Sequence, residues 1–298
     1  MPVPHDFLAL AAATCWAVGA ILSVTPARHL GTFAFNRWRM FSVALMLWTV
    51  TFVSGGPGSL SPWMLTTMAI SGLVGIFVGD SALFAAMNRL GPRRAGVLFA
   101  LHAVFSAALG FVFLGERMGL QAALGAALTL SGVMTAVLLG RRREEDHAWE
   151  SDRGPLVVGV ALGLLSALCQ AVGTFIAKPV MAAGMDPFVA SAIRTTVSCA
   201  AHFVLLWAGF AGARAHQPLT PRMLGQTALN GFIGMGLGMS CLLWALRYGD
   251  VGTVAILSSV SPVVVLPLLW WRLGRAPAPG AWVGAGLTVL GTALILSR

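Results

Sequence analysis

Residues 125–132 read GAALTLSG and residues 284–291 read GAGLTVLG, so five of the eight positions are identical. The offset of 159 residues that aligns these two stretches also aligns small residues earlier in the chain. The aligned pairs are Gly72 with Gly231, Gly75 with Gly234, Gly79 with Gly238, Ser81 with Ser240 and Gly115 with Gly274. A constant register over so long a distance indicates two copies of one unit.

The beginnings of the two copies align with a slightly smaller offset. Residues 15–19 read CWAVG, and residues 169–173 read CQAVG, so that Gln170 stands where the first copy has Trp16. With one further residue of shift, Arg39 aligns with Arg194. The copies have therefore diverged at individual positions while keeping the same order of segments.

The composition excludes a soluble protein. Hydrophobic residues make up 57% of the 298 residues and charged residues only 10%, whereas a soluble domain carries about 25% charged residues. The net charge of +9 does not indicate a nucleic-acid partner, because the arginines are scattered between apolar runs. The sequence has no P-loop and no metal-binding motif, so we expect no cofactor and no metal.

Ten apolar stretches are long enough to cross a bilayer. They cover residues 6–26, 33–54, 63–87, 94–114, 118–139, 155–177, 187–210, 222–247, 251–271 and 279–297. A polar linker at 141–154 divides the chain into a first repeat, 1–140, and a second repeat, 155–298. Because five spans is an odd number, the second copy enters the membrane from the opposite side. We therefore expect an all-α membrane protein with ten transmembrane helices in two inverted five-helix repeats, the architecture of secondary transporters.

Two stretches resemble a known family. Residues 88–117, NRLGPRRAGVLFALHAVFSAALGFVFLGER, and residues 16–19, WAVG, are similar to the EamA-type signatures of the drug/metabolite transporter superfamily. The resemblance implies a ten-helix transporter, similar to the aromatic amino-acid exporters of this superfamily. Other branches move purines, sulfur-containing amino acids or nucleotide sugars. This chain departs from the family at two positions. It has Ala103 where a proline is usual in the fourth span, although the second copy keeps Pro262. It has the family's glutamate as Glu116, but the second copy has Arg275 at the equivalent position.

Charged and titratable residues inside the spans are costly and therefore few. Asp80 lies late in the third span, where it could bind an ammonium group or a proton, or pair with Arg89 or Arg93 near a helix end. His102 lies near the middle of the fourth span and is a candidate substrate-binding residue, with a structural role as the alternative. Arg39 and Arg194 are expected to anchor their helices at the lipid headgroups, because long cationic side chains snorkel.

Other candidates would complete a central substrate site. Aromatic side chains could form an apolar wall for a ring-bearing substrate, and polar side chains could contact its charged groups. These candidates are Trp16, Phe99 and Trp244 for the wall, and Gln170, Ser258, Ser261 and Lys178 for the polar contacts. Pro262 would kink the ninth span and act as a hinge or gate, and Gly79 and Gly238 would permit close helix approach at the gate.

These features predict a transporter rather than an enzyme. The expected substrate is a small amphipathic metabolite, most simply an aromatic or apolar amino acid, which moves through a central cavity by alternating access. The expected partners are this small molecule and the lipid bilayer, with no nucleic acid and a monomeric chain. The alternatives are a membrane-embedded enzyme for lipid-linked substrates and a transporter of another metabolite class. The resemblance implies export across the inner (plasma) membrane with both termini inside, whereas the arginine distribution favours both termini outside.

Overall fold

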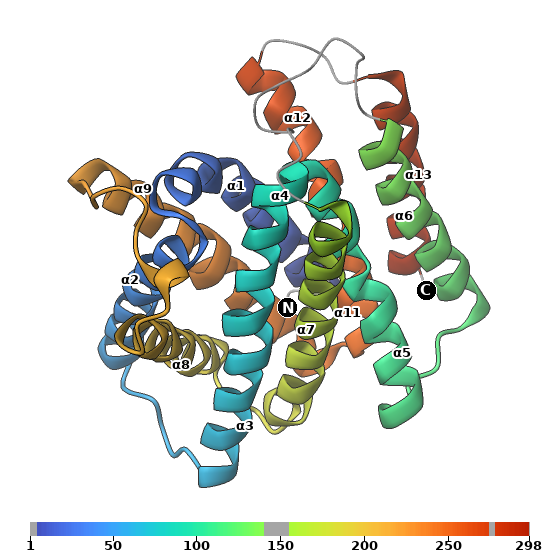
Figure 1. The fold of residues 1–298 in the computed structure, drawn as a ribbon. Helices are drawn as coiled ribbons and strands as arrows, with labels where there is room; N and C mark the ends of the chain where they lie inside the picture. Colours follow the sequence, from blue (N-terminus) through green and yellow to red (C-terminus); the bar gives the residue numbers. More distant parts are fainter. Residues whose placement is uncertain (1–4, 140–154, 274–277, 298) are drawn as a thin grey trace.

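The computed structural model describes residues 5–139, 155–273 and 278–297, which form helices and loops without a strand (Figure 1). Eight helical stretches in these residues are long and apolar enough to cross a membrane. They are His5–Leu30, Pro62–Gly91, Arg94–Leu114, Leu156–Ala182, Pro187–Trp207, Pro221–Tyr248, Val251–Leu268 and Pro279–Leu296. With α2 (Thr32–Val53) and α6 (Leu120–Leu139), they correspond to the ten expected spans. The linker expected at 141–154 and Arg275 lie outside the described residues.

Several spans consist of more than one helix. The third span comprises α3 (Pro62–Gly72), the π-helix η1 (Leu73–Val78) and the start of α4 (Gly79–Ala100). The fourth comprises the end of α4 and α5 (His102–Leu114). The eighth comprises α9 (Pro221–Gly231), the π-helix η3 (Phe232–Met239) and α10 (Ser240–Tyr248), and the ninth comprises α11 (Val251–Ser258) and α12 (Ser261–Leu273). The spans with one helix are α1 (His5–Leu30), α7 (Leu156–Ala182), α8 (Pro187–Trp207) and α13 (Pro279–Leu296), besides α2 and α6.

The third and eighth spans begin in the same way. The Ser61 hydroxyl accepts a hydrogen bond from the backbone N–H of Met64 at 3.2 Å, and the Thr220 hydroxyl accepts one from Met223 at 3.3 Å. A proline follows each cap as the first helical residue, where its missing N–H costs nothing. The 159-residue offset thus holds at the level of helix capping.

The two copies are interlocked rather than side by side. Helix α1 packs against α9, η3, α10, α11 and α12 of the second copy, and α7 packs against α3, η1, α4 and α5 of the first. Helix α2 lies along α8 (Figure 1). The first span therefore belongs to a bundle with the eighth and ninth, and the sixth span belongs to a bundle with the third and fourth.

The repeated stretch at 125–132 and 284–291 forms one helix–helix contact. Helices α6 and α13 run together at one side of the molecule (Figure 1). A Cβ atom at Gly125 would lie 2.8 Å from the carbonyl oxygen of Gly291, so the two backbones touch where both copies have glycine. The two copies of the repeated stretch thus lie in contact with each other through their glycines.

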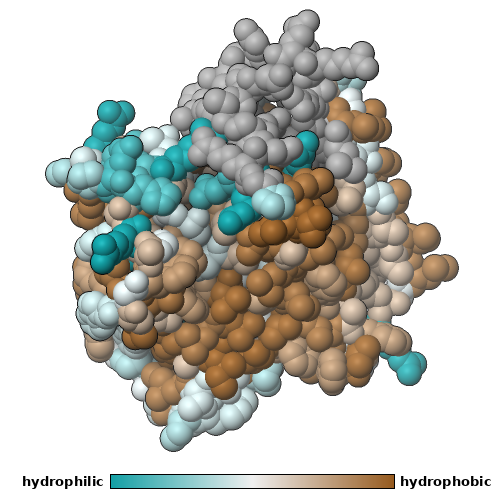
Figure 2. All heavy atoms as spheres, in the orientation of Figure 1, coloured by the Kyte–Doolittle hydropathy of each residue, from teal (hydrophilic) through white to brown (hydrophobic). Residues whose placement is uncertain are grey.

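Apolar side chains cover much of one face of the molecule. Figure 2 shows a broad hydrophobic area across the middle of one face, with hydrophilic residues gathered toward its upper left edge. The exposed large apolar residues include Phe111, Val112 and Phe113 at the end of α5. An exposed apolar area of this kind marks a surface that contacts lipid. The chain is thus a multi-pass membrane protein.

Candidate functional site

The two π-helices occupy equivalent positions in the two copies. The 159-residue offset moves η1 (Leu73–Val78) onto residues 232–237, which lie inside η3 (Phe232–Met239). Helix η1 packs on α7 and α8, and η3 packs on α1 and α2. π-Helices are rare and often mark functional sites. The apolar sequence of these segments gives no signal for them beyond their glycines.

An arginine-bearing helix docks onto the residue before each π-helix. A Cβ atom at Gly72 would lie 2.6 Å from the carbonyl oxygen of Arg194, and one at Gly231 would lie 3.0 Å from Cγ of Arg39. Both contacts need glycine, because any side chain there would overlap the neighbouring helix. The arginines are therefore held at matching places against the third and eighth spans.

Both arginines are buried inside the protein. Arg39 is 5% exposed and Arg194 is 0% exposed, so the expectation that they anchor their helices at the interface is wrong. Each lies seven residues from the start of its helix, about 10 Å along the axis. Close packing on glycine turns that part of α2 and α8 toward the protein interior.

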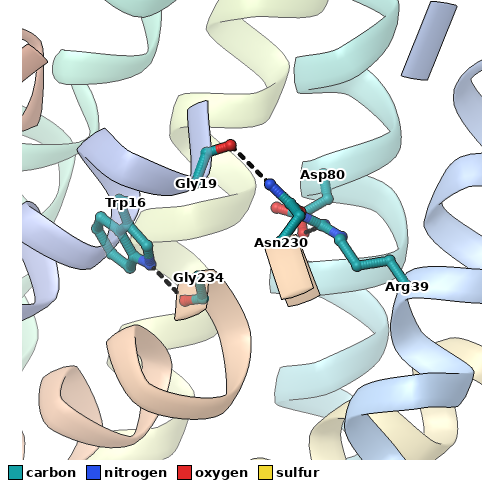
Figure 3. Close-up of polar contacts among 6 residues, drawn as sticks. All are labelled: Trp16, Gly19, Arg39, Asp80, Asn230 and Gly234. Carbon is teal, nitrogen blue, oxygen red and sulfur yellow. Dashed lines mark hydrogen bonds and ion pairs between the residues drawn. The ribbon is translucent and has the colours of Figure 1, made fainter. Parts of the chain in front are cut away.

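Asp80 forms a buried ion pair with Arg39. The guanidinium of Arg39 donates to the carboxylate of Asp80 (Figure 3), and Asp80 is 6% exposed. The rings of Phe84 and Phe35 lie 4.9 Å and 5.4 Å from the Arg39 guanidinium carbon. Asp80 therefore pairs with Arg39 and not with Arg89, one of the two partners expected near a helix end; Arg89 instead donates to the carbonyl of Ala85 at 3.3 Å. The side chain of Arg93, the other expected partner, lies outside the described part of the structure.

Within the part of the chain that the structure describes, the equivalent arginine in the second copy has no carboxylate of its own. The repeat offset places Met239 at the position of Asp80, and Arg194 Nη1 lies 3.1 Å from the Met239 sulfur. The Nε and Nη2 atoms of Arg194 are buried and have no hydrogen-bond partner in the described residues. Arg194 also interacts electrostatically with Asp80. We call Arg39, Asp80 and Arg194 the charged cluster; it holds two guanidinium groups and one carboxylate.

Polar side chains bridge the copies next to this cluster. Asn230 Nδ2 donates to the carbonyl of Gly19 at 2.6 Å (Figure 3), and Ser71 donates to the carbonyl of Gly173 at 2.6 Å. The two bonds are related by the repeat. Asn230 Oδ1 is buried without a partner in the described residues. Our sequence reasoning missed Asn230 and Ser71, although both directly precede the aligned glycines Gly231 and Gly72.

Three of the expected aromatic and titratable residues come together. Trp16 Nε1 donates to the carbonyl of Gly234 at 3.0 Å (Figure 3), and its ring centroid lies 6.4 Å from that of His102. His102 and Phe99 are 5.0 Å apart between ring centroids. His102 is 2% exposed, and its Nε2 atom is buried without a hydrogen-bond partner in the ranges that the structure describes. We call these three residues the ring cluster; it brings two apolar rings against an imidazole whose Nε2 has no partner in the described residues.

Three other expected binding residues make contacts within the fold or lie partly at its surface. Lys178 donates to the carbonyls of Leu246 at 2.9 Å and Gly249 at 2.7 Å, so it caps the end of α10. The Gln170 side chain contacts Thr174 on its own helix at 3.5 Å. Trp244 is 42% exposed on α10. These placements leave the substrate roles of the three residues as predictions.

The fourth and ninth spans break at equivalent places. The ninth span is interrupted at 259–260, just before Ser261 and Pro262, and the fourth is interrupted at Leu101, just before His102. The fourth span has Ala103 where the ninth has Pro262, so the break does not require proline. Next to the breaks, Ser261 donates across to the carbonyl of Ala13 at 2.7 Å, whereas Ser258 bonds within its own helix to Ala255 at 3.0 Å.

Gly79 and Gly238 sit where spans from different copies meet. A Cβ atom at Gly79 would lie 3.2 Å from Cβ of Cys169, and one at Gly238 would lie 3.0 Å from Cβ of Cys15. The close helix approach expected at these glycines is present. Their action as hinges or gates stays a prediction.

The duplicated fold, the broken helices and the buried polar groups where the two copies meet define a membrane transporter with internal repeats. The sequence model of the EamA-like transporter family matches residues 4–138 and again residues 157–297. The chain belongs to the EamA-like transporter family. The double match agrees with the two copies seen in the sequence and in the fold.

Two similar proteins add detail. A protein of Streptantibioticus cattleyicolor named "Probable terminal-alkyne amino-acid exporter" is 30% identical over 238 residues, covering 78% of this chain and 74% of that protein. A crystal structure described only as that of a protein has a TM-score of 0.78 and 18% identity, covering 97% of this chain and 95% of that chain. The second likeness shows the fold alone.

Proposed function

We propose that this protein exports small amphipathic amino acids, aromatic or apolar, across the inner membrane by alternating access. The observation that carries the proposal is the position of the ring cluster beside the charged cluster. The indole Nε1 of Trp16 lies 3.1 Å from the position that a Cβ atom on Gly238 would take. Nη1 of Arg194 contacts the sulfur of the next residue, Met239. Apolar rings and ionic groups thus flank one short segment of η3.

This pairing suits an amino acid. An aromatic or aliphatic side chain would pack on the rings of Trp16, Phe99 and His102, since aromatic surfaces supply most of the contact energy in apolar sites. The zwitterionic backbone would meet groups of both charges in the charged cluster. The name of the Streptantibioticus relative supports the same substrate class.

The interlocked bundles support alternating access. The first, eighth and ninth spans pack together, as do the third, fourth and sixth. Each bundle contains one of the two equivalent breaks, the ninth span at 259–260 or the fourth span at Leu101. Rocking of these bundles about a central site is the general behaviour of inverted-repeat transporters.

An enzyme acting on lipid-linked substrates receives less support. Such an enzyme needs a positioned nucleophile and base. The carboxylate of Asp80, the central acidic group, is engaged by Arg39. The ring cluster gives His102 two aromatic neighbours rather than a hydroxyl or thiol partner.

A counterflow assay tests the proposal. Purified protein in liposomes would be loaded with single amino acids, with purines and sulfur-containing amino acids as rival cargo, and the uptake of labelled substrate measured. We expect exchange of aromatic or branched apolar amino acids, with His102→Ala and Asp80→Asn each reducing it at least tenfold. Gly96→Ala is the control, since a Cβ there meets nothing within 4 Å.

Two results would contradict the proposal. A folded wild-type protein that exchanges no amino acid would exclude the substrate class. Normal exchange by both His102→Ala and Asp80→Asn would exclude the site, even if the substrate class held.

A further inference from the structure

We propose that Arg194 is the binding site for the carboxylate group of the transported substrate. This inference rests on the proposed amino-acid export and names the residue that recognises the charged end of the cargo. It is carried by the different partners of two arginines at equivalent positions in the two copies. Arg39 has a carboxylate partner in Asp80, and Arg194 has the sulfur of Met239 in its place.

The acidic residues that the structure describes do not supply a second anion. Asp186 accepts from the backbone N–H groups at the start of α8, and Glu116 does the same for α11. Asp6 lies 3.5 Å from His5, and Asp250 is the residue before α11. Among the acidic residues of the described ranges, Asp80 alone lies with the two arginines, so the charged cluster keeps one positive charge in excess.

A buried cation without an anion is strongly unfavourable inside a membrane protein. Arg194 is 0% exposed, and a sulfur atom is only a weak acceptor. The excess charge is therefore expected to be neutralised at some stage of the transport cycle. A substrate carboxylate supplies the one missing negative charge.

The geometry of the unused donors favours a carboxylate. Nε and Nη2 of Arg194 both lack a partner in the described parts of the chain. In a guanidinium group, the Nε–H and the neighbouring Nη2–H point the same way and form a two-donor edge. Such an edge binds the two oxygens of a carboxylate with parallel hydrogen bonds.

Arg194 lies at the contact between the two bundles. Its Nη2 is 3.0 Å from the position of a Cβ at Gly75 in the third span, and its Nη1 contacts Met239 in the eighth. These spans belong to different bundles. Separation of the bundles would expose the donor edge, and their closure would enclose a bound carboxylate.

The test compares substrates with and without the carboxylate in the full-length protein. L-Phenylalanine, L-leucine, their amides and phenethylamine would compete in counterflow and would be added to purified protein in thermal unfolding. We expect the amides and the amine to compete at least tenfold more weakly than the acids. Arg194→Gln should raise KM for the acids about 10- to 100-fold, as expected for loss of hydrogen bonds to a charged group, and Arg194→Lys should restore part of the loss.

A second pair of variants keeps Arg194 in place. Met239→Asp gives Arg194 the carboxylate that the first copy has at Asp80. We expect this variant to fold and to unfold at a higher temperature than Met239→Asn. The acids should no longer compete for exchange by this variant. Met239→Asn, which adds polarity without charge, should lose much less.

The outcomes separate the inference from the proposed function. If the wild type exchanges amino acids and Arg194→Gln leaves KM for the acids unchanged, the inference alone is wrong. The inference is also wrong if the amides compete as well as the acids. It is wrong as well if chloride alone raises the unfolding temperature as much as the acids do, in an Arg194-dependent way, while Arg194→Gln leaves transport of the acids unaffected. If the folded wild type exchanges no amino acid, both are wrong.

Discussion

The carboxylate of Glu116 accepts a hydrogen bond from the backbone N–H of Val251 at 2.8 Å and a second from Gly252 at 3.2 Å. Glu116 follows the fourth span in the first copy, and Val251 is the first residue of α11 in the second. An acidic side chain from one copy thus caps a helix of the other. The carboxylate satisfies two N–H groups that have no acceptor within the helix. Its negative charge also interacts favourably with the positive end of the helix dipole.

Replacing Glu116 with alanine should destabilise the ninth span. Loss of a side-chain cap costs about 1–2 kcal/mol, so thermal unfolding of the purified protein should begin several degrees lower. Glu116→Gln keeps an acceptor oxygen and should lose less. Equal unfolding temperatures for wild type and Glu116→Ala would show that this cap contributes nothing to stability.

The Arg39–Asp80 pair should show strong coupling in a double-mutant cycle. Asp80→Asn leaves Arg39 buried and uncompensated, which costs about 3–5 kcal/mol when one partner of a buried pair is removed. Arg39→Met combined with Asp80→Asn removes both charges and should recover part of that loss. Unfolding of the single and double variants in the same detergent measures the coupling, and simple addition of the two single effects would contradict it.

Gly72 should tolerate no side chain. A Cβ there would lie 2.6 Å from the carbonyl oxygen and 2.7 Å from Cα of Arg194, and backbone atoms cannot move aside as a flexible side chain can. Overpacking of this kind costs about 1–3 kcal/mol or more, so Gly72→Ala should give low yields of monodisperse protein. Gly96→Ala should behave as wild type in size-exclusion chromatography; equal behaviour of the two variants would refute the contact.

Lys178 should act on stability rather than on substrate affinity. Its ammonium group caps the carbonyls of Leu246 and Gly249, so Lys178→Met should lower the unfolding temperature, with a loss of about 1.5–3 kcal/mol for hydrogen bonds from a charged group. KM for an exchanged amino acid should stay within about twofold. A large rise in KM with unchanged stability would instead support the substrate contact expected from the sequence.

Much of the fold could be predicted from the sequence because it depends on local composition. Apolar runs long enough to cross a bilayer fix the spans, and glycines at a constant offset reveal the duplication. The family resemblance followed from residues 16–19 and 88–117. The helix breaks were predicted only at Pro262, since Ala103 gives no local signal for the break in the fourth span.

The candidate site was harder to predict. Trp16, Phe99 and His102 were candidates for the substrate site and are found together, but Arg39 and Arg194 were expected at the lipid headgroups. Snorkelling is the usual behaviour of an isolated cation near a helix end. Gly72 and Gly231 change that outcome, because they let α8 and α2 approach closely enough to bury both side chains.

The sequence by itself determined the class of protein, the ten spans and the twofold repeat, because hydrophobic length and residue spacing act along the chain. Only the tertiary structure decided which charges meet: it gave Asp80 to Arg39 and left Arg194 against Met239. The physical reason is that these partners lie on different spans, and buried charges pair according to how helices pack rather than by their distance in sequence.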